Sequence, residues 1–101
     1  MAASHGSFTE FYQFYLSEHA KRSTKLLHFA GTFLVLVILG VALLRQNWLL
    51  LLLLPVVGYG FAWVGHFFFE KNKPASFSSP LYSLLGDFVM FKDILTGRVK
   101  L

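Results

Sequence analysis

Residues 26–44 read LLHFAGTFLVLVILGVALL and residues 48–69 read WLLLLLLPVVGYGFAWVGHFFF, with only Arg45, Gln46 and Asn47 between them. A helix needs roughly 20 apolar residues to cross a hydrocarbon core of about 30 Å, and both runs approach that length. Because the connector is so short, the two helices are expected to run antiparallel as a hairpin. His28 lies near the start of the first run and His66 near the end of the second, so both histidines belong to the same end of this hairpin.

The composition indicates that a bilayer is the solvent of this chain. Of its 101 residues, 55% are hydrophobic and 14% are charged, whereas soluble domains average about 25% charged residues. A single domain, residues 1–101, is expected, and a soluble core of this size would not enclose two uninterrupted apolar runs. In lipid each segment must pair its own backbone groups. The predicted fold class is therefore all-α, an integral membrane hairpin with spans at 26–44 and 48–69.

The basic residues predict how the hairpin is oriented. Three of them precede the first span and only Arg45 lies in the connector, while five follow the second span: Lys71, Lys73, Lys92, Arg98 and Lys100. The positive-inside rule then places both ends of the chain in the cytoplasm, on the inner face of the cytoplasmic membrane. We interpret the net charge of +4 as topology signals and lipid headgroup contacts, not as a nucleic-acid-binding surface.

A short helix is predicted before the hairpin, over residues 8–22. Ser7 and Glu10 fit a capping box, in which the Ser7 side chain accepts a hydrogen bond from the Glu10 N–H. The aromatic residues that follow recur at helical spacing on one face, which ends in His19 near the cytoplasmic mouth of the first span. This segment is too short and too polar to cross a membrane, so we expect it to lie in the interface.

A second flanking helix is predicted over residues 80–96, with Ser79 as its cap and Pro80 at its first position. We expect it to be amphipathic or re-entrant and to cover the cytoplasmic end of the hairpin. Its apolar stripe consists of Leu81, Leu84, Leu85, Phe88 and Leu95.

The packing of the two spans is also suggested by their sequences. Pro55 should make the second span irregular, since its ring removes a backbone hydrogen bond. Gly58, Ala62 and Gly65 form a stripe of small residues that permits close helix packing in lipid, and His28, Gly31 and Thr32 offer a comparable face on the first span. The same stripe could instead pack against a second copy of the chain in a homo-oligomer.

The histidines are the candidate site. His19, His28 and His66 are predicted to converge at the cytoplasmic end of the hairpin, with Glu70 four residues after His66 on the same helical face. The chain has no cysteine, so these imidazoles are its natural metal ligands, and a histidine set with a carboxylate and open positions suits non-haem Fe(II). Asp87 is a weaker candidate, placed either against Ser83 or toward the headgroups. His5 is assigned no role. The alternative for each histidine is an ordinary interfacial residue.

Several segments resemble one known family. FYQFY at 11–15, His19 and LHF at 27–29 are similar to the opening motif of small membrane proteins related to the fungal 2-hydroxy fatty acid dioxygenase of the endoplasmic reticulum. The segment GHFFFEKNKPA at 65–75 resembles that family's G-H-x-x-x-E-x-x-x-P-A motif, and LL at 84–85 with FVMF at 88–91 extends the likeness. One departure is KRST at 21–24, where the family usually has an Asn-Pro-x-Asn stretch.

The resemblance implies an Fe(II)-dependent dioxygenase that uses O2 to shorten 2-hydroxy fatty acids by one carbon. It implies that His19, His28 and His66 are the iron ligands, with Glu70 as a catalytic carboxylate beside them. From charge and depth alone, Lys25, Lys71 or Lys73 would attract the substrate carboxylate. Two alternatives remain open at this point: a b-type haem electron carrier with His28 and His66 as axial ligands, and a non-catalytic membrane scaffold.

Overall fold

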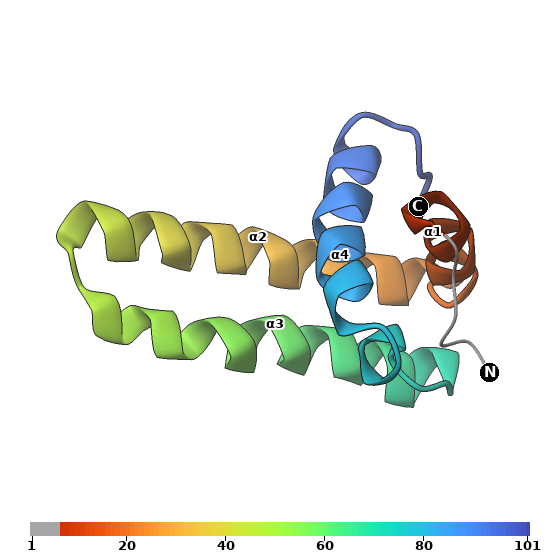
Figure 1. Cartoon of the computed structure of the whole chain (residues 1–101), viewed down its shortest axis with the longest axis horizontal. Coiled ribbons are helices and arrows are strands. Elements are labelled where there is room, and N and C mark those ends of the chain that lie inside the picture. Colours follow the sequence, from red (N-terminus) through yellow and green to blue (C-terminus); the bar gives the residue numbers. More distant parts are fainter. Residues whose placement is uncertain (1–6) are drawn as a thin grey trace.

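The computed structural model describes residues 7–101, and these residues form helices and connecting loops without any strand (Figure 1). His5 lies outside the described residues. The predicted all-α class is therefore confirmed for the part of the chain that the structure describes. The elements, in chain order, are α1 (Phe8–Ser17), α2 (Arg22–Arg45), the 3-10 helix η1 (Trp48–Leu52), α3 (Leu53–Val64), the π-helix η2 (Gly65–Glu70), the 3-10 helix η3 (Ala75–Phe77) and α4 (Pro80–Leu95).

The long helices α2 and α3 run antiparallel and side by side, and the connector between them forms the far end of the molecule (Figure 1). α2 ends at Arg45, and the left-handed backbone of the capping residue Gln46 (φ 52°) turns the chain back. Two helical segments, Arg22–Arg45 and Trp48–Glu70, are long and apolar enough to cross a membrane, judged by length and composition alone. Only 22% and 11% of their most apolar windows are buried inside the protein, whereas the core helix of a soluble protein would be mostly buried.

The helix boundaries differ from those predicted by hydropathy. The first helix, predicted over 8–22, ends at Ser17, and α2 begins at Arg22, four residues before the apolar run. Backbone hydrogen bonding continues through the polar residues that precede the apolar run, so hydropathy alone underestimates the length of α2. The break at residues 18–21 allows α1 to turn away from α2. The predicted cap of α1 is present, because the Ser7 Oγ accepts from the Glu10 N–H at 3.3 Å.

The irregularity predicted for the second span takes the form of changes in helix type. The span begins as the 3-10 helix η1, and Pro55 lies in the first turn of α3, where a missing N–H is tolerated. It ends as the π-helix η2, whose wider turn carries His66. π-Helical turns inside longer helices are frequent at functional sites.

Small residues allow α2 and α3 to approach closely, on the faces that the sequence suggested. A Cβ atom added to Gly31 would lie 2.8 Å from the Cβ of Phe61, and one added to Gly65 would lie 3.1 Å from the Cγ2 of Thr24. Gly58 faces Val35 in the same way, at 3.5 Å. The glycine stripe is thus occupied within one chain, and a role for it between two copies stays a prediction.

Gly31→Ala should destabilise the hairpin although alanine is the better helix former. The added methyl group meets the root of Phe61, which cannot rotate away, so the helices must separate at a cost of about 1–3 kcal/mol. Gly40→Ala is the matched control, because a Cβ there meets nothing within 4 Å and should stabilise α2 by roughly 0.5–1 kcal/mol. Unfolding of both variants by denaturing detergent in mixed micelles checks the prediction, and equal stabilities would contradict it.

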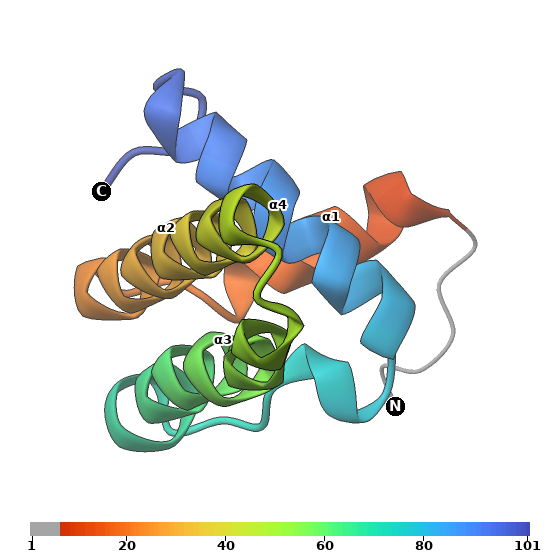
Figure 2. The ribbon, with the colours of Figure 1, turned by 90° about the vertical axis from the view of Figure 1, so that its left-hand side faces the viewer.

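α1 and α4 lie across the open end of the hairpin, as the view along its length shows (Figure 2). A small core joins them: Phe11 and Tyr15 of α1 pack with Met90 of α4 and with Ala75 of η3. Gly86 allows this contact, because a Cβ there would lie 3.1 Å from the Tyr15 ring. The open end of the hairpin is therefore covered by aromatic and small residues from both flanking helices.

The structure shows which face of α4 packs. Its buried residues are Ser83, Gly86, Met90 and Asp93, whereas the ends of the apolar stripe are exposed, with Leu81 at 80% and Leu95 at 63%. The packed face is thus the one with small and polar residues. Ser79 occupies the N-cap position with Pro80 directly after it, as predicted, although the Ser79 side chain makes no capping hydrogen bond.

Candidate metal centre

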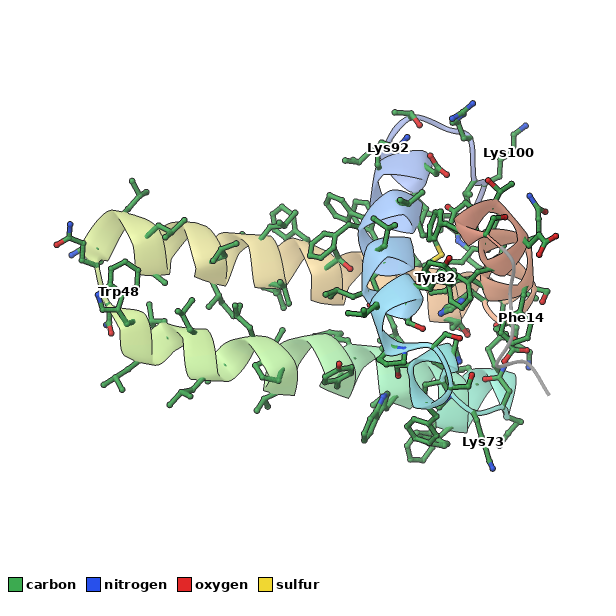
Figure 3. The ribbon with its side chains drawn as sticks, in the orientation of Figure 1. Phe14, Trp48, Lys73, Tyr82, Lys92 and Lys100 are labelled. Atoms are coloured by element: carbon green, nitrogen blue, oxygen red, sulfur yellow. The ribbon has the colours of Figure 1, made fainter. Side chains whose placement is uncertain are left out.

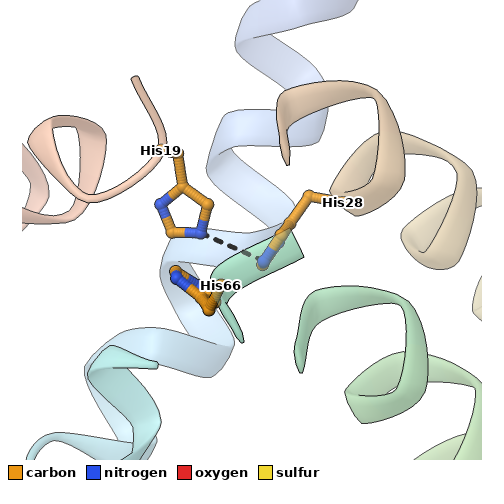
Figure 4. Close-up of side chains that lie close together, drawn as sticks. All are labelled: His19, His28 and His66. Carbon is orange, nitrogen blue, oxygen red and sulfur yellow. Dashed lines mark hydrogen bonds between the residues drawn. The ribbon is translucent and has the colours of Figure 1, made fainter. Parts of the chain in front are cut away.

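The structure brings together the three histidines singled out in the sequence. His19 lies in the loop between α1 and α2, His28 on α2, and His66 on η2, and all three are buried. One ring nitrogen from each lies within 4.8 Å of the other two. The His19 and His28 Nε2 atoms are 3.0 Å apart, and the His66 ring centre is 4.5 Å from that of His19 and 5.5 Å from that of His28 (Figure 4).

Each imidazole has a hydrogen-bond acceptor on its outer side. The Nδ1 of His19 lies 2.7 Å from the backbone carbonyl oxygen of Tyr15, and the Nδ1 of His66 lies 2.7 Å from the Oδ1 of Asn72. The Nδ1 of His28 lies 3.4 Å from the Asp87 carboxylate and 3.3 Å from the Tyr15 hydroxyl, which itself donates to Asp87. A backbone carbonyl, an amide oxygen and a carboxylate are typical outer partners of metal-binding histidines.

These partners determine which nitrogens are free. A carbonyl oxygen can only accept, so the Nδ1 of His19 must carry a proton. The Tyr15 hydroxyl donates its single proton to Asp87 and can only accept from the His28 Nδ1, which must therefore carry a proton as well. In a neutral ring the remaining nitrogen, Nε2, then holds a lone pair. The two Nε2 atoms that face each other at 3.0 Å are therefore both acceptors, and their lone pairs repel each other unless a cation lies between them. The His66 Nδ1 donates in the same way, which leaves its Nε2 as the third ligand atom.

The local fold places His66 and its partner. η2 ends at Lys71, whose left-handed backbone (φ 61°) reverses the chain, and the Asn72 N–H then donates to the His66 carbonyl at 3.0 Å. The same reversal brings the Asn72 side chain back onto the His66 ring. Its amide orientation is fixed from the other side, because the Asn72 Nδ2 donates to the Glu18 carbonyl oxygen at 3.2 Å.

Two cavities meet at the histidines. A small cavity of about 20 Å³ is lined by all three imidazoles together with Tyr15 and Asp87, and it has room for one small ion or water molecule. A larger groove of about 360 Å³ runs between α2, α3 and α4, and its lining is mainly apolar. His28, Ser83 and Asp87 line both cavities, so the groove opens onto the histidine cluster.

The family comparison agrees with this site. A family model described as 2-hydroxy-palmitic acid dioxygenase Mpo1-like matches residues 5–99, nearly the whole chain. The chain belongs to the Mpo1-like family. No match was found among curated proteins or among solved structures. The resemblance seen in the sequence is thus confirmed, and the name of the family includes both a reaction class, dioxygenase, and a 2-hydroxy acid.

Burial keeps His19 of this Mpo1-like protein uncharged. Burial, followed by repulsion from His28, lowers the pKa of His19 from 6.5 to about 2. The Tyr15 ring stacks on the His19 ring, with ring centres 4.2 Å apart. Burial and then the negative charge of Asp87 raise the pKa of Tyr15, so its hydroxyl keeps its proton. The site therefore presents a neutral His19 imidazole and a protonated Tyr15 phenol, and the neutral form of an imidazole is the one that binds a metal ion.

The metal-free protein should lose stability on acidification. His19 has a pKa of about 2 when folded and about 6.5 when unfolded, so between these values only the unfolded chain binds the proton. Stability is complete above about pH 6.5 and falls as the pH drops below it. Thermal unfolding in detergent at about pH 7.5 and about pH 5 measures this loss, which should be smaller for His19→Asn. An identical pH dependence in both proteins would contradict the assignment.

The other predicted site residues lie outside the small cavity. The Glu70 carboxylate accepts from the Lys21 backbone N–H at 2.6 Å, so it connects the end of η2 to the start of α2. The Lys25 Nζ donates to the Lys100 carbonyl at 3.0 Å, and its charge also acts on His19. Lys71 and Lys73 are exposed, and Lys73 extends away from the body of the protein (Figure 3).

Two outer partners were not identified as such from the sequence. Asn72 was given no role at the histidines, and Asp87 was expected to contact Ser83 or the headgroups. That expectation is wrong for Asp87, which contacts His28 and Tyr15. The available signal for Asn72 was its position just beyond the end of the helix that carries His66.

Proposed function

We propose that this protein is a membrane-embedded, Fe(II)-dependent dioxygenase that shortens 2-hydroxy fatty acids by one carbon. The observation that carries the proposal is the set of three buried Nε2 atoms, whose lone pairs converge while each Nδ1 is bonded to an acceptor. The class of reaction is proposed from the name of the family to which the chain belongs.

The residues present fit a single metal ion. Three imidazoles around one small cavity suit Fe(II), and three protein ligands leave positions for other groups. When bound, Fe(II) supplies a Lewis acid and the means of activating O2. A haem with His28 and His66 as axial ligands would need the space between those rings, and His19 packs against both, with ring centres 4.3 and 4.5 Å away. This packing favours the single ion.

The electrons of the proposed reaction balance between the substrate and one O2 molecule. Converting C2 to the new carboxyl group and releasing C1 as carbon dioxide removes four electrons from the acid. One O2 molecule accepts four electrons when its oxygen atoms end in water and in the new carboxyl group. The reaction therefore needs no other oxidant or reductant, which agrees with a small protein that has a single site.

Asp87 and Tyr15 would control where protons lie beside His28. Asp87 keeps the proton of His28 on Nδ1 and accepts from the Tyr15 hydroxyl, so the lone pair of His28 stays directed into the small cavity. The Tyr15 hydroxyl is the nearest proton-bearing group behind His28, at 3.3 Å from its Nδ1. Glu70 acts as a positioning residue in this proposal, because it fixes the two segments that carry His66 and His28. Lys25, with Lys71 and Lys73 at the rim, would attract the substrate carboxylate.

The positions of one tryptophan and three lysine side chains support an orientation of the hairpin in the membrane. Trp48 lies at the connector end of the hairpin, and Lys73, Lys92 and Lys100 lie at the opposite end, beside α1 and α4 (Figure 3). We propose that Arg22–Arg45 and Trp48–Glu70 cross the cytoplasmic membrane and that the histidine end faces the cytoplasm. The head of a lipid substrate then reaches the histidines while its tail stays at the depth of the spans.

Turnover by the purified protein tests this function. The protein in lipid nanodiscs, supplied with Fe(II), should convert 2-hydroxyhexadecanoate to pentadecanoate and consume one O2 per product. Hexadecanoate, which lacks the hydroxyl group, is the matched control and should not react. Anaerobic incubation should stop the reaction. A strong Soret band in the active protein, or turnover without added metal after chelation, would contradict the proposal.

A further inference from the structure

The larger groove has a defined position and two chemically different ends. His28, Thr32, Val35 and Leu39 line it from one face of α2, and Leu54 and Gly58 line it from α3. The α4 residues that complete it include Ser83 and Asp87, next to the histidines. The groove thus leads from the polar cluster along the hairpin to the apolar pair Leu39 and Leu54.

The polar end of the groove contains a hydroxyl group without a partner. The Ser83 Oγ is buried, and it has no hydrogen-bond partner among residues 7–101. Ser83 also lines both cavities, so its hydroxyl lies where the groove meets the histidine cluster. A buried hydroxyl without a hydrogen-bond partner is energetically unfavourable. We therefore expect a polar atom of a ligand to form the missing hydrogen bond with Ser83.

We propose that this groove is the binding site for the alkyl chain of the substrate, with Ser83 donating to the substrate head and Leu39 and Leu54 limiting the chain length. The proposal rests on the proposed function for the identity of the head group. A fatty acyl chain is the occupant that matches a narrow apolar groove, open to lipid and continuous with a polar site.

The length of the groove suits a long chain. Leu39 follows His28 by eleven residues, or about 17 Å along α2, which is the length of an extended chain of about 13 methylene groups. The tail of the substrate is in lipid before it binds, so the groove gains little from removing it from water. Its selectivity must therefore come from shape, because a chain that is too long meets Leu39 and Leu54.

Photo-crosslinking with substrate analogues tests the proposal independently of turnover. The probes are 2-hydroxydodecanoate and 2-hydroxyhexadecanoate with a diazirine at the terminal carbon, added to the Fe(II)-loaded protein in nanodiscs. The longer probe should label residues around Leu39 and Leu54, and the shorter probe should label residues nearer Val35. Leu39→Trp should lower labelling by the longer probe relative to the shorter one about tenfold. Leu54→Trp repeats the test from α3.

The matched control is Leu36→Trp, since Leu36 is 40% exposed and does not line the groove. It should leave the ratio of the two probes unchanged. Ser83→Ala should lower the labelling yield of both probes about fivefold, because their head loses its hydrogen-bond donor. Labelling spread over exposed residues such as Leu36, with the same ratio in all variants, would overturn the proposal. Groove labelling without turnover would instead overturn only the proposed reaction.

Discussion

We expect His28→Ala to lose its bound metal and to lower the turnover of 2-hydroxyhexadecanoate more than about hundredfold. Loss of an outer partner of a ligand typically lowers metal affinity about 10–100-fold, and loss of the ligand itself should do more. His28 also contacts both Asp87 and His19, so its removal leaves the Tyr15–Asp87 pair without its link to the site. Metal analysis of the purified variant and oxygen uptake in nanodiscs measure the two effects.

His5→Ala is the histidine control for this experiment, because the sequence gives His5 no role. It should retain the metal content and turnover of the unchanged protein. A His28→Ala protein that still holds one equivalent of iron and still turns over would show that the three converging imidazoles are not the ligands. The scaffold alternative predicts that the substitution leaves the metal content unchanged and that neither protein turns over, so the experiment separates the two hypotheses.

Asp87→Asn should weaken metal binding about 10–100-fold while leaving the fold intact. The neutral amide keeps the size of the carboxylate but no longer holds the proton on the His28 Nδ1 by charge. His28 then exchanges freely between its two tautomers, and the form with a proton on Nε2 is unable to bind a metal ion. Competition with a chelator of known affinity measures the change in the metal dissociation constant.

Asp93→Asn is the matched control for Asp87→Asn. Asp93 lies on the same helix, is buried, and accepts from the Tyr12 hydroxyl at 2.8 Å, but it does not line either cavity. The substitution should leave the metal affinity unchanged even if it lowers stability. Equal losses of affinity in the two variants would mean that burial of charge on α4, and not contact with His28, is responsible.

The sequence was sufficient to predict the hairpin and the positions of its histidines, because the spacing of the apolar runs largely determines both. Two apolar runs with a short connector leave few arrangements, so the shared end of His28 and His66 could be predicted from spacing. His19 followed from the aromatic face of α1. The outer partners could not be predicted, because Asn72 and Asp87 reach the histidines through a chain reversal and a crossing helix.

Regular helix geometry, assumed from the sequence, missed two local details. Glu70 was placed near His66 by the spacing of an α-helix, whereas η2 is a π-helix with a wider turn, and the Glu70 carboxylate contacts the Lys21 N–H. A catalytic role for Glu70 stays a prediction. On α4 the apolar stripe was recognised, but the packed face, with Ser83, Gly86 and Asp93, was not.

The position of α4 across the hairpin determines when the site can form during synthesis. His19, His28 and His66 all precede α4 in the chain, yet Asp87 and Ser83 belong to α4. Until α4 docks on the hairpin, His28 lacks its carboxylate neighbour and the groove lacks one wall. Under the proposed function, the complete metal site would therefore form only after the last helix of the chain has been made and has docked.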